Sequence, residues 1–119
     1  MELKHECVRE VLLVIEKEHT LHGTLENAVF ENNISKFSNE DIEYCLRLLN
    51  NAKYLTAEFT MDGYIVYGMT FEGHSLLDSI RNNTVWEETQ DCVKRFGSIS
   101  IPVLQQLASS ISKKLLGLE

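Results

Sequence analysis

One polar group in the second half of the sequence has residue types that suit phosphate or partner binding. His74, Asp78 and Arg81 follow Gly73 at spacings that place all three along one face of a helix. An imidazole and a guanidinium can contact phosphate, whereas a pair between Asp78 and Arg81, or between His74 and Asp78, would only fix the helix against its neighbours. The spacing favours the structural role, and the three residues form a secondary candidate cluster.

Two histidines, His19 and His22, have the spacing of metal ligands on one helical turn, with Glu16 and Glu18 nearby. A metal site needs three or four ligands in a defined geometry, and no Cys or His motif completes this set. A solvated helix end is therefore the favoured interpretation, and we expect no metal.

No set of residues indicates catalysis. The sequence lacks the Gly-x-Ser-x-Gly, phosphate-loop and His-Glu-x-x-His motifs. Adjacent carboxylates such as Glu87 and Glu88 point to different sides of a helix. We therefore expect a protein that is not an enzyme, with no catalytic residue, no cofactor and no small-molecule substrate.

A stronger candidate for binding is the predicted helix 39–52. Ser38 has the features of an N-cap, with Asp41 three residues further on, and the apolar residues from Ile42 to Leu49 recur at helical spacing. The opposite face forms the candidate binding face, which carries Asn39, Glu40, Glu43, Tyr44, Arg47, Asn50 and Asn51.

Composition argues against DNA as the main partner of this face. Arg47, Asn50 and Asn39 suit contacts to base edges. However, Glu40, Asp41 and Glu43 lie on or near the N-terminal end of the helix, which would enter the DNA groove. The chain has 119 residues with 11 Lys+Arg and 18 Asp+Glu, a net charge of −7, and no basic segment. Affinity for a phosphate backbone comes mostly from Lys and Arg.

The remaining pattern predicts a single α+β domain over 1–119 that is mostly helical. Helices are expected over Leu3–Lys17 and from Phe71 to Arg81 after a Thr70 cap. Asp62-Gly63 predicts a hairpin turn, with Phe59 opposite Val66. Residues 24–37 are ambiguous in secondary structure. Their pattern allows a short helix that opens at 24–27 and a short strand at 34–36. Two more helices follow, one from a Thr84–Glu87 capping box to Gly97 and one with Pro102 in its first turn.

This order of elements predicts a winged helix-turn-helix. Its core would span residues 1–70, with 39–52 as recognition helix and a two-stranded wing, and 71–119 would be a helical extension. No apolar run is long enough to span a bilayer and the N-terminus has no signal-peptide pattern, so we expect a cytoplasmic protein. The cysteines are odd in number and far apart in the sequence, which fits a reducing compartment. We expect all three to be buried as small apolar residues, namely Cys7, Cys45 and Cys92.

A family resemblance adds to this interpretation. The run from Leu46 to Leu55 resembles the recognition helix and first wing strand of bacterial winged-helix proteins. The block from Thr70 to Trp86, with Thr-x-Glu-Gly-His and Leu-Asp-x-Ile-Arg, resembles a bacterial and prophage family catalogued as domain of unknown function 2513. The resemblance covers nearly the whole chain and implies winged-helix architecture but no activity. Cys45 departs from the histidine expected in the family's helix.

Two function classes follow from these observations. The favoured class is a non-enzymatic protein-binding module in a bacterial or prophage context, contacting a protein partner through helix 39–52 or a second copy through its C-terminal helices. The alternative is a DNA-binding transcriptional regulator that uses Asn39, Tyr44, Arg47 and Asn50.

Overall fold

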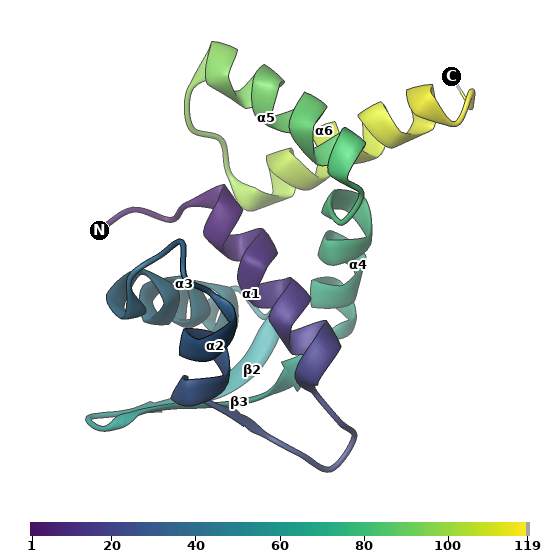
Figure 1. Cartoon of the computed structure of the whole chain (residues 1–119). Helices are drawn as coiled ribbons and strands as arrows, with labels where there is room; N and C mark the ends of the chain where they lie inside the picture. Colours follow the sequence, from purple (N-terminus) through teal and green to yellow (C-terminus); the bar gives the residue numbers. More distant parts are fainter. Residues whose placement is uncertain (119) are drawn as a thin grey trace. The chain divides into compact units, whose positions relative to one another are not determined.

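A computed structural model describes residues 1–118 of the chain (Figure 1). Within them the protein is α+β and mostly helical, with six helices and one small antiparallel sheet. The chain divides into two compact units, Met1–His74 and the segment from Ser75 onward. The elements in chain order are α1 His5–Glu18, β1 Leu25–Glu26, α2 Asn27–Asn33, α3 Asn39–Asn51, β2 Leu55–Thr60, β3 Gly63–Met69, α4 Phe71–Ile80, α5 Asn83–Phe96 and α6 Ile101–Leu115.

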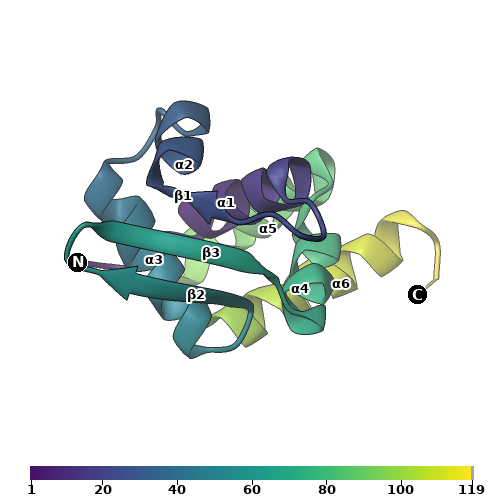
Figure 2. The ribbon, with the colours of Figure 1, turned by 90° about the horizontal axis from the view of Figure 1, so that it is seen from below.

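The first unit is built around the three strands, which lie in the order β1-β3-β2 (Figure 2). Helix α1 packs on α2, α3 and β3, and α3 also packs on β2. The inner side of α1 is apolar and buried, and includes Val8, Val11, Leu12 and Ile15. The sheet and the three helices therefore share one core, and α3 is held by contacts along its inner side.

The hairpin forms as predicted, but its register differs from the sequence-based expectation. Thr60 pairs with Gly63 and Phe59 pairs with Tyr64, so the turn is Met61-Asp62 and Val66 lies opposite Ala57. The predicted pairing of Phe59 with Val66 is wrong by two residues. Because side chains alternate with a period of two, a shift of two residues leaves Phe59 and Val66 on the same face of the hairpin.

A β-bulge interrupts the hairpin near its open end. Ala57 pairs with Val66, whereas the preceding residue Thr56 pairs with Gly68, so Tyr67 is the extra residue on β3. Gly68 has a φ of +146° and lies against His19, whose Cε1 would be 2.6 Å from a Cβ at this position. The bulge therefore coincides with a close approach between β3 and the residue that follows α1.

The ambiguous segment 24–37 contains a strand, but not where the sequence predicted one. Leu25 pairs with Val66 as part of β1, and α2 starts directly afterwards. The strand expected at 34–36 is wrong, because the Ile34 N–H donates to the Phe30 carbonyl at 2.9 Å and closes the last turn of α2. Ile34 is buried as a helix-terminal residue instead.

The second unit consists of the later part of α4 with α5 and α6. Helix α5 starts earlier than predicted, because Asn82 Oδ1, not Thr84, accepts the Val85 N–H at 3.0 Å. Asparagine caps a helix at least as well as threonine does. Helix α5 ends at Gly97 as predicted, and α6 has Ser100 as N-cap and Pro102 in its first turn. Helices α5 and α6 pack against each other.

Candidate functional site

Helix α3 carries the residues of the candidate binding face on the side opposite its buried residues. Ser38 Oγ accepts the Asp41 N–H at 3.1 Å, which fixes the start of the helix. Its buried residues are the predicted stripe, namely Ile42, Cys45, Leu46 and Leu49. On the other side Asn39, Glu40, Arg47 and Asn51 are exposed, and Glu43, Tyr44 and Asn50 are half-buried.

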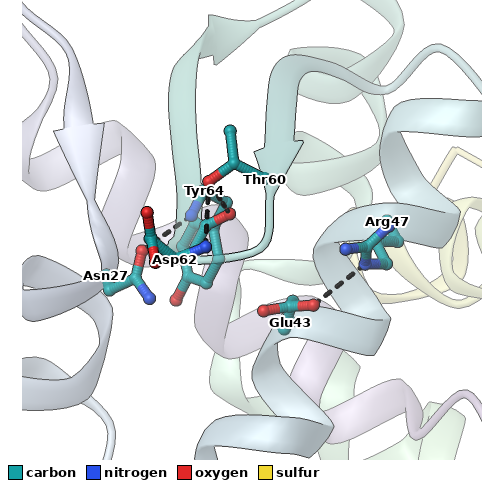
Figure 3. Close-up of polar contacts among 7 residues, drawn as sticks. Asn27, Glu43, Arg47, Thr60, Asp62 and Tyr64 are labelled. Carbon is teal, nitrogen blue, oxygen red and sulfur yellow. Dashed lines mark hydrogen bonds and ion pairs between the residues drawn. The ribbon is translucent and has the colours of Figure 1, made fainter.

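Arg47 is held on this face by two partners. Its Nε donates to Glu43 Oε2 at 3.0 Å, an ion pair between successive helical turns (Figure 3). Its guanidinium also lies over the ring of Phe59 on β2, 4.6 Å from the ring centroid. Arg47 is therefore partly neutralised by Glu43, and its planar group already stacks on the hairpin.

Asn50 has a structural partner as well. Its Oδ1 accepts the Ala57 N–H at 3.0 Å, which joins the last turn of α3 to strand β2. A base contact through Asn50 would compete with this bond. Among the residues proposed for base contacts, Asn39 and Tyr44 have no hydrogen bond of this kind in the described chain.

An aromatic row links α3 to α2 through the hairpin. The Phe59 and Tyr64 ring centroids are 6.1 Å apart, and Tyr64 meets Phe30 edge-on at 5.7 Å. Burial raises the pKa of the Tyr64 phenol, and the carboxylates of Glu31 and Glu43 raise it further. Negative charge thus borders the row on both the α2 side and the α3 side.

The hairpin tip lies next to the start of α2. Asn27 Oδ1 accepts the Tyr64 N–H at 2.8 Å (Figure 3). An open hollow of about 450 Å³ lies here, lined in part by the carboxylates of Glu26, Glu31 and Asp62. Met61 at the turn is fully exposed. Nothing in the sequence pattern distinguished Asn27, because its role depends on where the hairpin tip lies.

The lysines at the entering end of α3 are ion-paired. Lys4 Nζ contacts Asp41 Oδ2 at 3.1 Å, and Lys36 Nζ contacts Glu6 Oε1 at 3.2 Å. The hydrogen bond from Lys4 lowers the pKa of Asp41, and Ser38 lowers it further. The positive charges closest to this end of the helix are therefore balanced by carboxylates.

The secondary cluster lies along α4. Arg81, which directly follows α4, donates through Nη2 to Asp78 Oδ1 at 2.8 Å, so the two residues form one of the pairs that the sequence suggested. His74 is exposed on the same helix. Gly73 before it is buried against the turn that precedes β2, where a Cβ would overlap the carbonyl oxygen of Tyr54. The glycine is therefore explained by close packing and not by ligand binding.

Within residues 1–118, no group of three or more His, Cys, Asp or Glu side chains is arranged to hold a metal ion. The same part of the chain has no helix long and apolar enough to cross a membrane.

Sequence comparison places the chain in a family. Residues 2–100 match the family model described as "Hypothetical protein (DUF2513)", so the chain belongs to this family. A protein of Haemophilus influenzae described as "Uncharacterized protein" is 27% identical over 121 residues, which cover 98% of this chain and 99% of the relative. No solved structure matches the chain significantly. The resemblance inferred from the block between Thr70 and Trp86 is therefore confirmed.

Proposed function

We propose that residues 1–74 form a winged helix-turn-helix that acts by binding, not catalysis, and that α3 and the hairpin contact a protein partner with a basic surface. The order of elements supports the architecture. A helix, a short strand, two helices and a hairpin follow one another, and β1 pairs beside β3. In this architecture α3 is the recognition helix and β2–β3 form the wing.

The negative charge of this surface is the observation that favours a basic protein as the partner. Arg47, the cation on the exposed face of α3, is already paired with Glu43. Glu40 and Asp62 are exposed at the helix start and at the wing turn. A surface of this sign attracts a basic protein and repels the phosphates of nucleic acid.

A labelled peptide rich in Lys and Arg tests the proposal by fluorescence anisotropy with the full chain. We expect binding that weakens between about 50 and 200 mM salt. The double variant Glu40→Lys/Asp62→Lys should lose about tenfold in affinity, equivalent to about 1.4 kcal/mol. The matched control is Glu87→Lys/Glu88→Lys on α5, which changes the net charge equally at two exposed positions. Equal losses in both variants would show attraction by overall charge alone and contradict the proposal.

DNA binding is the second candidate, and the order of elements favours it. Many proteins with this arrangement insert the recognition helix into the major groove. Arg47 is the side chain best placed to reach a base edge, provided that it leaves Glu43. Anisotropy of duplex DNA at about 50 mM salt, compared with Arg47→Ala, tests this candidate. Binding that falls in the variant would support DNA, and an absence of binding at low salt would exclude it for the isolated chain.

A further inference from the structure

Two of the three cysteines, far apart in the sequence, meet inside the first unit. Cys7 lies in the first half of α1 and Cys45 in the middle of α3, and these helices pack on each other. The exposed fraction of each residue is 1%. The Cys45 thiol is hydrogen-bonded to the Cys7 sulfur. The Cys7 thiol in turn is directed at the Asp41 carbonyl oxygen, 4.0 Å away.

The two thiols differ in their surroundings. The hydrogen bond from Cys45 lowers the pKa of Cys7, and the ammonium of Lys4 acts in the same direction against burial and Asp41. The hydrogen bond to Cys7 and burial both raise the pKa of Cys45. Because the thiolate is the reactive form, this difference favours Cys7 as the thiol that attacks peroxide and Cys45 as the resolving thiol.

Cys7 is 1% exposed, so peroxide can reach its sulfur only when the start of α1 opens. The Lys4–Asp41 ion pair lies at this end of the helix contact, and 40% of the Lys4 side chain is exposed. The N-cap of α1, Lys4 itself, makes no capping hydrogen bond through its side chain. Because helix ends fray, the first turn of α1 opens more easily than the middle of α3, and closing a sulfur–sulfur bond requires such a shift.

We propose that Cys7 and Cys45 are a peroxide-sensitive thiol pair, which forms a disulfide that cross-links α1 to α3. The Cys7 thiolate attacks one oxygen of hydrogen peroxide, the O–O bond breaks, and the hydroxide released takes a proton to leave as water. Cys7 is then a sulfenic acid. The Cys45 sulfur attacks the Cys7 sulfur, the S–O bond breaks, and the hydroxyl leaves as a second water with the Cys45 proton. Peroxide is reduced and the two thiols are oxidised. This inference is independent of the partner that the surface binds.

Peptide mapping tests the proposal directly. Trypsin places the three cysteines in separate peptides, 5–9, 37–47 and 82–94. The reduced full chain is treated with hydrogen peroxide while folded, blocked with an alkylating agent and digested without reductant. We expect a linked peptide that joins 5–9 to 37–47 and is released by reductant. Its absence, or linkage of either peptide to 82–94 instead, would overturn the proposal.

Three comparisons make the result specific. Cys92→Ser should leave the yield of the linked peptide unchanged. Cys45→Ser should abolish it and leave a sulfenic acid on Cys7 that dimedone traps. Since a buried serine can impair folding, the wild-type chain is also oxidised in urea. If the linked peptide forms in urea but not in the folded chain, the proposal is wrong whatever the variant does.

Discussion

Asn27 and Tyr64 join α2 to the wing through one hydrogen bond, from the Tyr64 backbone N–H to Asn27 Oδ1 at 2.8 Å. The Asn27 amide lies so close to Gly63 that a Cβ on this glycine would overlap it. Gly63 has a φ of +143°. The hairpin is thus positioned by an amide from another element as well as by its own turn.

Asn27→Ala should destabilise the fold by about 1–2 kcal/mol, because the variant leaves the N–H of a buried residue without its acceptor. The free energy of unfolding in urea measures this, and amide exchange should show faster exchange at Tyr64. Asn32→Ala, at an exposed position of the same helix, is the matched control, with an expected change within about 0.5 kcal/mol. Equal stability of the two variants would contradict the role given to Asn27.

Gly73→Ala should destabilise the protein although it replaces glycine within a helix. Intrinsic propensity alone would favour alanine by about 1 kcal/mol. The added Cβ overlaps the Tyr54 carbonyl oxygen, a backbone atom that cannot rotate away, and overpacking of this kind costs about 1–3 kcal/mol. Thermal unfolding gives the sign of the change. Glu72→Ala, exposed on the same helix, should be close to wild type, and a stabilised Gly73→Ala would disprove the contact.

The lowered pKa of Asp41 predicts that the folded protein loses stability in acid. Lys4 and Ser38 lower its pKa in the folded protein. A carboxyl group with a lowered folded pKa stabilises the fold above its unfolded pKa of about 3.9, and this contribution disappears as the pH falls through the folded pKa. Lys4→Gln removes the main cause, so this variant should lose less stability than wild type between about pH 5 and 2.

Urea unfolding at a series of pH values measures that difference. Lys17→Gln removes an exposed lysine from α1, the helix that Lys4 precedes, and serves as the control. Its acid profile should follow that of the wild type. If Lys4→Gln also follows the wild type, the Lys4–Asp41 bond does not account for the pKa of Asp41.

Ser38→Ala should cost about 1 kcal/mol of stability, because the Asp41 N–H loses its side-chain acceptor at the start of α3. Ser38→Asp should recover most of the loss, since aspartate caps equally well. Ser35→Ala in the exposed segment before it tests for a general effect of removing a hydroxyl. Chemical denaturation of the three variants decides the matter, and a neutral Ser38→Ala would contradict the capping role.

Local signals explain why much of the fold was predictable. The Ser38 cap and the spacing from Ile42 to Leu49 depend on residues within one helix, and both were predicted correctly. The presence of a hairpin with its turn at Asp62 was also predicted, because the turn signal is local. Strand β1 was not predictable in this way, since Leu25 and Glu26 are a strand only through their pairing with Val66 and Ile65.

The candidate site shows the same division between local and distant contacts. The sequence placed Arg47 and Asn50 on the open face of α3. It did not show that Phe59 stacks beneath Arg47 or that Ala57 uses the Asn50 amide oxygen, because both contacts depend on the hairpin register. The meeting of Cys7 with Cys45 was missed for the same reason, as it results from helix packing.

Tyr67 is the extra residue of the β3 bulge. The number of residues in this strand therefore matters for the fold independently of which side chains they carry. Replacing an exposed residue here leaves the pairing of its neighbours intact. Removing the residue would close the ladder, turn Gly68 outward and direct Met69 to the place beside His19, where a Cβ would already lie 2.6 Å from the His19 Cε1. Among related chains, substitutions should therefore be common at this position and single-residue deletions rare.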